Sequence, residues 1–183
     1  MTHLNTFLET THFTIKPLNA QELVYYRIND GRLEHALGIP YYPRIVPFEL
    51  ADALEQEIIP SVETNPDYYL YYTLWTIYHK EYDSLVGDIC FKGPADENGQ
   101  IEIGYGTYSD FQGKGIMKEA LTLIINWVFE QPKVCRIMAE TEHDNIASHK
   151  VLLANHFKPV ENLYTTMWYR DKPYPASHSR PLL

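Results

Sequence analysis

Residues 100–130 constrain the fold most, because a strand-like segment passes through a short glycine loop directly into a long amphipathic helix. Residues 100–108 (QIEIGYGTY) are rich in branched and aromatic residues, which favours a strand. Over 115–130 the apolar residues recur at helical spacing, and Pro132 ends the pattern. The apolar positions are Met117, Ala120, Leu121, Ile124, Ile125 and Val128. Such a strand–loop–helix unit indicates an α/β or α+β domain.

The remaining segments give the order βααβββαβαβ(β). A turn cluster at 94–99 joins two strands as a hairpin, and Pro60 is expected to end the second helix. Further strands are predicted over 12–18, 68–79, 85–92, 134–141 and 159–170, and further helices over 19–37, 48–59 and 145–156. We therefore expect one domain built around one mixed sheet.

Length and charge narrow the classes of function. A chain of 183 residues suits a single domain with a real core. The formal net charge of −9 gives no general attraction for nucleic acid or anionic lipid, and it favours a cationic substrate. Cys90 and Cys135 lie in apolar, strand-like runs and are interpreted as small core residues. With neither a signal peptide nor an apolar run of membrane-spanning length, we expect a cytoplasmic protein without nucleic-acid or membrane partners.

The loop Gln112-Gly113-Lys114-Gly115 is a candidate anion site. Glycines let the backbone turn tightly, and the first N–H groups of the following helix lack partners within it. Together with the helix dipole, these groups suit a phosphate or pyrophosphate. A Walker loop does not fit, because Gly115 follows the lysine, and a dinucleotide fingerprint does not fit, because Lys118 replaces its third glycine. A surface turn without a ligand stays open on the glycines alone.

The longer pattern resembles motif A of the GNAT superfamily of N-acetyltransferases, which reads Gln/Arg-x-x-Gly-x-Gly/Ala. Gln112 and Gly115 match it, and Met117 replaces the final small residue. The Glu-Ile-Gly-Tyr of 102–105 is similar to the RimJ/RimL-like branch, the ribosomal-protein N-acetyltransferases. The resemblance implies acetyl-coenzyme A as co-substrate, with its pyrophosphate on this loop. The implied coenzyme-binding residues here are Thr107, Gln112, Gly113, Lys114, Gly115, Ile116 and Met117.

A second segment, 145–157, resembles GNAT motif B, which reads Asn-x-x-Ser, then Leu, then Gly-Phe. Asn145, Ser148 and Phe157 match, and His156 replaces the glycine. A non-glycine residue there requires either left-handed backbone geometry or an altered helix cap. The resemblance implies that Asn145 binds the pantetheine arm and that Ser148 lies near the thioester sulfur. The alternatives are a helix N-cap for Asn145 and a solvent-facing or capping hydroxyl for Ser148.

This resemblance implies a single GNAT-like domain with an α/β (α+β) fold. Its sheet is expected to be mixed and mainly antiparallel, with six to seven strands and helices on both faces. Two neighbouring parallel strands, near 101–108 and 134–141, are expected to splay apart and admit coenzyme A. We expect residues 1–84 to form the acceptor side, 85–157 the coenzyme-binding core, and 158–183 the C-terminal strands and tail.

The implied reaction is direct transfer of an acetyl group to an amine, which is either a protein N-terminus or a small molecule. A protonated amine cannot attack a thioester, so some group must accept a proton. Glu102 is the first candidate, because it shares a strand face with Gly104 and Gly106. Its alternative is a cross-strand ion pair with Lys92 or Arg136. A backbone N–H near Gly106 is the expected oxyanion donor.

Several alternatives stay open on the sequence. Glu140 and Glu142 are weaker candidates for the base. The spacing of His143, His149 and His156 matches no common metal site, so no metal is expected. The rival functions are a non-catalytic acyl-coenzyme A sensor and an interaction domain with an empty loop. A monomer or a homodimer is expected.

Overall fold

One eight-stranded sheet runs through the computed structural model, which describes residues 7–173. The strand order is β1-β2-β3-β4-β5-β6-β8-β7, and only the neighbours β5 and β6 are parallel. The mixed, mainly antiparallel sheet is thus confirmed, with one strand more than the six to seven expected, because the two-residue β1 pairs with β2. The strands are β1 (Leu8–Glu9), β2 (Phe13–Pro17), β3 (Leu74–His79), β4 (Ser84–Phe91), β5 (Gln100–Thr107), β6 (Arg136–Glu142), β7 (Lys158–Glu161) and β8 (Thr165–Asp171).

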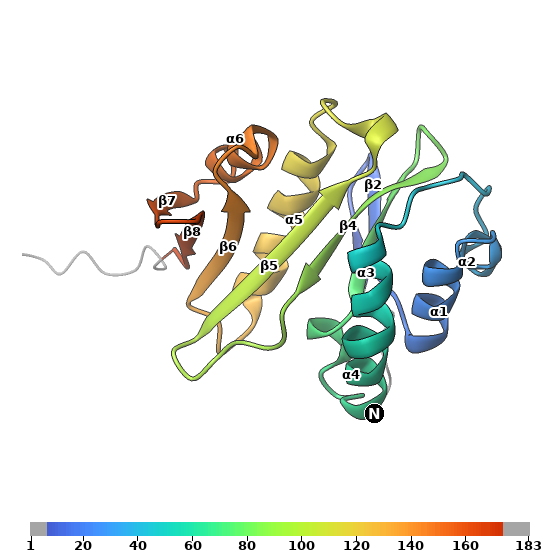
Figure 1. Cartoon of the computed structure of the whole chain (residues 1–183), viewed down its shortest axis with the longest axis horizontal. Helices are drawn as coiled ribbons and strands as arrows, with labels where there is room; N and C mark the ends of the chain where they lie inside the picture. Colours follow the sequence, from blue (N-terminus) through green and yellow to red (C-terminus); the bar gives the residue numbers. More distant parts are fainter. Residues whose placement is uncertain (1–6, 174–183) are drawn as a thin grey trace, which may run out of the picture.

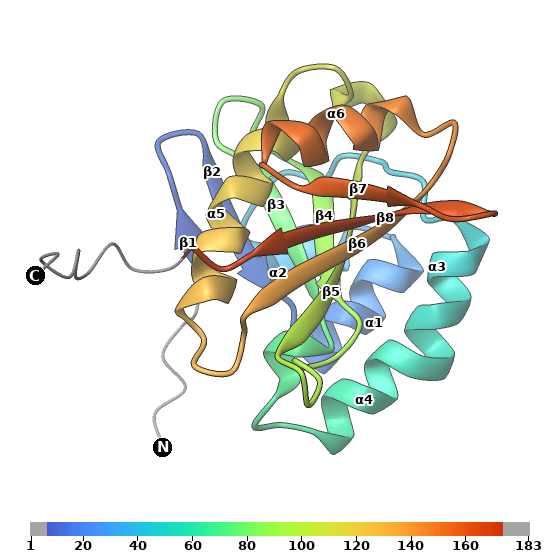
Figure 2. The ribbon, with the colours of Figure 1, turned by 90° about the vertical axis from the view of Figure 1, so that its left-hand side faces the viewer.

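Helices cover both faces of the sheet, as expected (Figures 1 and 2). The long α5 packs on one face, α1 to α4 lie on the other, and α6 follows β6 near the C-terminal hairpin. The α-helices are α1 (Ala20–Ile28), α2 (Arg32–Leu37), α3 (Phe48–Ala53), α4 (Ile59–Thr64), α5 (Ile116–Glu130) and α6 (Ile146–Ala154). A π turn, η1 (Leu54–Ile58), and two 3-10 turns, η2 (Tyr69–Tyr71) and η3 (Ser109–Phe111), complete the described part.

The larger core lies between α5 and the sheet. Ile101 and Ile103 alternate inward along β5, at 1% and 2% exposure, and meet the apolar face of α5. All six apolar positions predicted for that helix are buried. A second core beneath α1 to α4 contains Leu23, Tyr26 and Leu54. The sheet is therefore held from both sides, which fixes β4 and β5 between two packed layers.

Two helices that the sequence predicts as continuous are interrupted in the structure, one at residues with positive φ and the other before a proline. The segment 19–37 divides into α1 and α2, because Asn29 ends α1 in the left-handed region at φ 56° and Gly31 also has positive φ. The second helix continues past Pro60 rather than ending there. The wider π turn η1 immediately precedes this proline, which has no N–H to donate and whose ring crowds an ordinary α turn.

The two cysteines differ from the expectation of core residues. Cys90 on β4 is half-buried, but Cys135 is exposed and lies one residue before β6. Its thiol contacts the Asn98 carbonyl oxygen at 3.1 Å. Both are free thiols. Within residues 7–173, no helix is long and apolar enough to span a membrane.

Candidate active site

The parallel strands β5 and β6 separate along their length. They pair only where Gln100–Glu102 face Arg136–Met138. Beyond that point β5 stays with β4 on one side, and β6 stays with β8 on the other. The expected splay is thus confirmed, and it leaves one edge of β5 from residue 103 to 107 without a paired strand.

The antiparallel register fixes which amides face this gap. The Lys92 N–H donates to the Glu102 carbonyl, and the Tyr108 N–H donates to the Val86 carbonyl. Because such ladders alternate, residues 102, 104, 106 and 108 turn their amides toward β4. The amides of residues 103, 105 and 107 consequently turn toward the gap. The oxyanion donor was expected to be a backbone N–H near Gly106. The Gly106 amide itself points away from the gap, and the amides of its two neighbours point into it.

The glycine loop joins this gap to α5. Gly113 and Gly115 adopt φ values of 73° and 77°, the left-handed region that glycine tolerates. Gly115 is the N-cap of α5, and no side chain caps the helix. Gln112 is exposed, and its side chain donates to the Thr107 carbonyl at 3.3 Å. The first-turn N–H groups of α5 are thus left for solvent or an anion.

Lys114 and Met117 have different surroundings. The Lys114 ammonium lies over the rings of Tyr82 and Phe111, at 4.7 and 5.2 Å from their centroids. Met117 is buried at 4% exposure together with Ile116, so the residue that departs from the small-residue pattern packs into the core.

The first turn of α6 lies across the gap from β5. Asn145 caps the helix, because its side-chain oxygen accepts from the Ser148 N–H at 3.0 Å. The Tyr105 hydroxyl donates to the Ser148 carbonyl at 3.2 Å and so ties β5 to α6. Burial raises the pKa of Tyr105 to about 12, so its hydroxyl stays protonated. The hydroxyl of Ser148 makes no hydrogen bond to another described residue.

His156 confirms one of the two geometries expected at the end of α6. Its φ is 62°, in the left-handed region. The N–H of Phe157 then reaches back to the Leu152 carbonyl at 3.0 Å, which closes the helix as a glycine would.

Glu102 forms the alternative ion pair. Its carboxylate contacts the ammonium of Lys92, the residue after β4, and 24% of the Glu102 side chain is exposed. It does not line the cavity described below. Its position therefore gives no support to the hypothesis that it accepts the proton.

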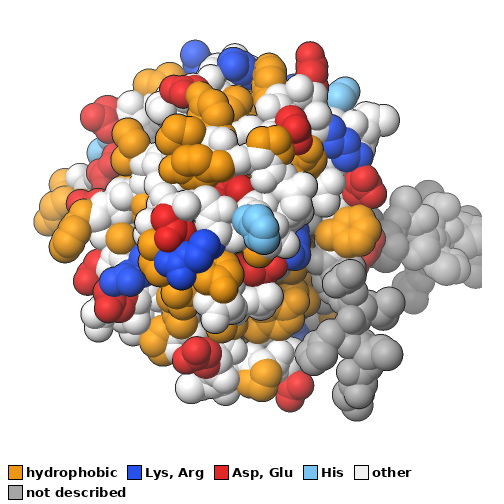
Figure 3. Space-filling model, turned by 90° about the vertical axis from the view of Figure 1, so that its right-hand side faces the viewer, with side chains coloured by type: hydrophobic (Ala, Val, Ile, Leu, Met, Phe, Trp, Pro, Cys, Tyr) orange, Lys and Arg blue, Asp and Glu red, His pale blue; other side chains and the backbone are white. Residues whose placement is uncertain are grey.

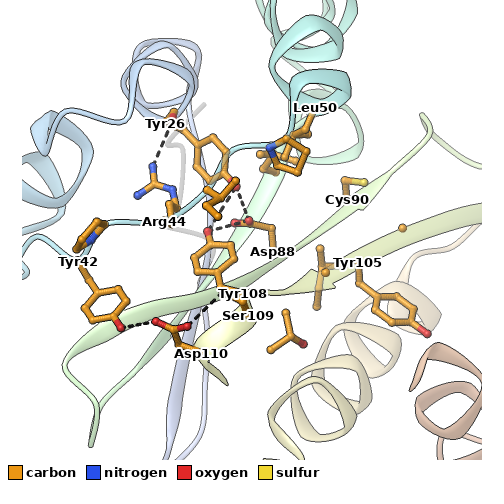
Figure 4. A pocket seen from close by; sticks show the side chains of 18 residues that line it. Tyr26, Tyr42, Arg44, Leu50, Asp88, Cys90, Tyr105, Tyr108, Ser109 and Asp110 are labelled. Carbon is orange, nitrogen blue, oxygen red and sulfur yellow. Dashed lines mark hydrogen bonds between the residues drawn. The ribbon is translucent and has the colours of Figure 1, made fainter. Parts of the chain in front are cut away.

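A cavity of about 630 Å³ opens beside β5 on the side of α1 and α3. It reaches from the gap region of β5 to the segment that joins α2 and α3 (Figure 4). Aliphatic side chains dominate the wall near α3 and the sheet, while Asp88 and Tyr108 form a polar corner next to β5. Its apolar lining includes Ile45, Pro47, Leu50, Leu74 and Ile89. The cavity and the gap share residues 104–107 and so form one continuous site.

Asp88 is the feature that the sequence analysis missed. Its Oδ2 accepts from the hydroxyls of Tyr26 and Tyr108 at 2.6 and 2.8 Å. Its Oδ1 is equally buried and is bonded to neither tyrosine; the Thr76 hydroxyl, on the residue opposite Asp88 on β3, is its neighbouring donor and lowers the pKa of the carboxyl. Burial raises the pKa of Asp88, against the opposing hydrogen bonds from the two tyrosines and the attraction of Arg44. The available signal was one carboxylate inside the otherwise apolar strand LVGDICF.

Arg44 also lines the cavity, but its hydrogen-bond partners are residues other than Asp88. Its guanidinium forms a buried ion pair with Glu34 and donates to the Tyr26 carbonyl at 3.2 Å. It also stacks on the Tyr26 ring at 4.4 Å. Cys90, which lines the cavity, has its pKa raised to about 11 by burial and therefore stays a thiol rather than a nucleophilic thiolate.

No cluster of three metal-ligating side chains occurs among residues 7–173. His149 instead contacts the Thr141 hydroxyl at 3.0 Å, and His143 contacts that of Thr166 at 3.1 Å. These histidines are thus part of the side-chain packing around β6 and β8.

The gap between β5 and β6 thus continues into the glycine loop before α5 and into the adjoining cavity. The acetyltransferase (GNAT) domain family matches residues 14–158, which is most of the chain, and the chain belongs to this family.

Relatives fall within the same family. The uncharacterized N-acetyltransferase YjdG of Bacillus subtilis is 44% identical over 78 residues, which are 43% of this chain and 46% of that protein. The chain thus spans about half the length of the curated relatives it matches. The ribosomal-protein-S5-alanine acetyltransferase of Vibrio fischeri has the same fold, with a TM-score of 0.66 at 18% identity over 91% of this chain and 97% of that one. RimL, a ribosomal L7/L12 acetyltransferase solved with coenzyme A, gives 0.64 at 19% identity over 91% and 98%.

Proposed function

We propose that this protein transfers the acetyl group of acetyl-coenzyme A to an amine by direct nucleophilic attack. The observation that carries the proposal is the unpaired edge of β5, which begins at the splay, ends at the uncapped start of α5, and opens sideways into a cavity. A coenzyme bound along this edge has its pyrophosphate at the loop and its thioester beside the cavity. The acceptor amine then approaches from the side of α1 and α3.

Main-chain groups carry most of the coenzyme binding in this proposal. The pyrophosphate lies on the amides from Gln112 to Met117, and the pantetheine arm pairs with the free edge of β5 near Thr107. Asn145 holds the first turn of α6 in place, with its oxygen already used by the Ser148 N–H. Ser148 then presents a free hydroxyl toward the departing sulfur.

The oxyanion of the tetrahedral intermediate needs a donor that points into the gap. The amides of Tyr105 and Thr107 meet this requirement, and the Gly106 amide does not. A donor of this kind typically lowers the barrier by about 3 kcal/mol. Gly106 contributes by having no side chain. A Cβ there would project into open space, with no other atom within 4 Å, and would occupy part of the site.

The acceptor is a primary amine, and no metal takes part. The cavity's acidic corner and the net charge of −9 favour a cationic acceptor over an anionic one. Charged residues of both signs are interspersed with hydrophobic ones on the face seen in Figure 3, which gives no reason to propose nucleic acid as a partner. The division into an acceptor side (1–84) and a coenzyme core (85–157) also belongs to this proposal, as do a cytoplasmic location and a monomeric or homodimeric state.

A turnover assay with thiol detection tests the proposal against the sensor alternative. The purified chain is incubated with acetyl-coenzyme A and a panel of primary amines, and acetylated product is confirmed by mass. We expect amine-dependent release of coenzyme A. Tight binding of the coenzyme without turnover on any amine would favour a sensor, and absence of binding would favour an interaction domain.

A further inference from the structure

The acceptor cavity contains a carboxylate that the fold leaves without a matching cation. Of the charged residues that line it, Arg44 is committed to the buried Glu34, and Asp110 is exposed and accepts from Tyr42 at 2.6 Å. Asp88 is 8% exposed and is bonded only to neutral hydroxyls. A buried carboxylate with one unpaired oxygen is costly, so a cationic ligand in this cavity would remove much of that cost.

The position of Asp88 places this carboxylate next to the proposed thioester. Asp88 pairs directly with Gly106 across β4 and β5. The amides of Tyr105 and Thr107, on either side of Gly106, face the gap. Asp88 therefore borders the acceptor cavity at the point where the coenzyme's reactive end is expected.

The two tyrosines fix the orientation of the carboxylate. Tyr26 reaches it from α1, and Tyr108 reaches it from the end of β5, and both donate to Oδ2 (Figure 4). Neither tyrosine uses Oδ1, so an ammonium in the cavity competes for this oxygen only with the Thr76 hydroxyl on β3. A primary ammonium carries three N–H donors and no acceptor, so it complements an oxygen that can only accept.

We propose that Asp88 binds the ammonium group of the acceptor and takes its proton. This inference rests on the proposed acetyl transfer. The ammonium R–NH3+ gives one proton to Oδ1 and becomes R–NH2, and its lone pair forms a C–N bond to the thioester carbonyl carbon. The C–S bond then breaks, the nitrogen gives its second proton to the leaving thiolate, and Asp88 returns its proton to solvent. The products are the amide R–NH–CO–CH3, the thiol of coenzyme A, and one proton.

The lining also indicates the class of acceptor. Leu50 and Leu74 face the same cavity as Asp88, and Ile45 and Pro47 continue this apolar surface toward the opening. An acceptor with one positive charge and an apolar body satisfies both parts of the cavity. A polyamine could place one further charge near the exposed Asp110, but its other charges would meet apolar side chains, where their desolvation is not compensated. The acceptor class that we infer is thus a monocationic primary amine on an apolar carrier.

The test compares wild type, Asp88→Asn, and Asp83→Asn as a matched control. Asp83 is an exposed aspartate on the β3–β4 turn that lines no part of the cavity. The acceptors are 2-phenylethylamine, spermidine and a short peptide with a free N-terminus, and coenzyme A affinity is measured by calorimetry. For Asp88→Asn we expect kcat/KM with 2-phenylethylamine to fall by about a hundredfold, while coenzyme A affinity stays within about twofold. Asp83→Asn is expected to match wild type.

A pH profile separates a chemical role from a structural one. The groups facing Asp88 are Tyr26 from α1, Tyr108 after β5, Arg44 from the α2–α3 segment and Cys90 on its own strand. We expect kcat/KM to fall as pH drops through the raised pKa of Asp88. Tyr108→Phe removes a hydrogen bond that stabilises the carboxylate, so this acid limb is expected to move to higher pH.

Each result of these experiments tests a different part of the proposal. Wild type inactive on every amine would contradict the proposed acetyl transfer itself. An active wild type with Asp88→Asn within about threefold of it would overturn the role of Asp88. Faster turnover of spermidine or of the peptide than of 2-phenylethylamine would overturn the acceptor class. If Asp88→Asn does not fold, the Tyr108→Phe profile decides, and an unmoved acid limb would overturn the proposal.

Discussion

At the scale of single residues, the site contains a carboxylate, that of Asp88, whose ionised form is costly to bury in the folded protein. Asp88 is buried, and burial raises its pKa. The folded state therefore holds its proton more strongly than the unfolded chain does. Stability from this group is present at low pH and is lost as pH rises through the raised pKa.

Asp88→Asn is accordingly expected to change stability in a pH-dependent way. Asparagine does not titrate and can still accept the two tyrosine hydrogen bonds. We expect its melting temperature to exceed that of wild type at pH 8, and the difference to shrink toward pH 4. Thermal melts across this range measure it. A variant less stable than wild type at every pH would show that the carboxylate is a net structural asset.

A variant of Ser148 tests whether its hydroxyl assists the departure of the coenzyme A thiolate. Asn145 accepts from the Ser148 N–H and Tyr105 donates to the Ser148 carbonyl, but the serine hydroxyl bonds to no other residue between 7 and 173. We expect Ser148→Ala to lower kcat by about tenfold and to leave coenzyme A affinity nearly unchanged, because only the leaving thiolate loses a partner. Ser61→Ala, in the half-buried part of α4, is the control. Equal turnover in all three proteins would return Ser148 to a purely structural part.

For Glu102, unlike Ser148, we expect that replacing the side chain leaves turnover nearly unchanged. Its ion pair with Lys92 is partly exposed, so its loss costs at most about 1 kcal/mol. We expect Glu102→Gln to fold and to turn over within about twofold of wild type, as does Lys92→Gln, because neither side chain lines the cavity. Steady-state kinetics at neutral pH measure this. A kcat reduced more than tenfold with intact coenzyme binding would restore Glu102 as the proton acceptor.

At the scale of elements, the close approach of β4 and β5 depends on one glycine. A Cβ on Gly87 would lie 2.5 Å from the Gly106 carbonyl oxygen and 3.2 Å from the Thr107 Cα. Gly87→Ala must therefore push β5 toward the gap, at a cost of about 1–3 kcal/mol. We expect a melting temperature lower by several degrees and weaker coenzyme A binding. Gly106→Ala meets open space and is expected to melt close to wild type, so equal melting of both variants would contradict this geometry.

The elements also show what the sequence could and could not predict. The apolar periodicity of 115–130 defined α5 almost to the residue, because one face of that helix meets only the sheet. The break between α1 and α2 depends on Asn29 in a left-handed cap, and the continuation past Pro60 depends on a π turn. Neither has a periodic signal, because both are local backbone adjustments to packing.

At the scale of the whole molecule, the sequence predicted the half of the site that is made of backbone. The loop follows from glycine spacing and strand–helix order, whereas the splay and the part of Asn145 were implied by the resemblance to the GNAT family. The acceptor half could not be predicted in this way. Tyr26, Asp88 and Tyr108 are as many as 82 residues apart in the chain, and they meet only because β4 and β5 pair beneath α1.

The central claim is that the start of α5 binds the coenzyme's pyrophosphate, and calorimetric titration of acetyl-coenzyme A tests it most directly. The variants are Gly115→Asp and its matched control Gly38→Asp. Both glycines have positive φ, 77° and 71°, and a Cβ on either meets nothing within 4 Å, but only Gly115 precedes α5. We predict that Gly115→Asp weakens binding by about tenfold or more, because it adds negative charge at an anion site. Gly38→Asp is predicted to bind like wild type, and equal affinity of both folded variants would contradict the account.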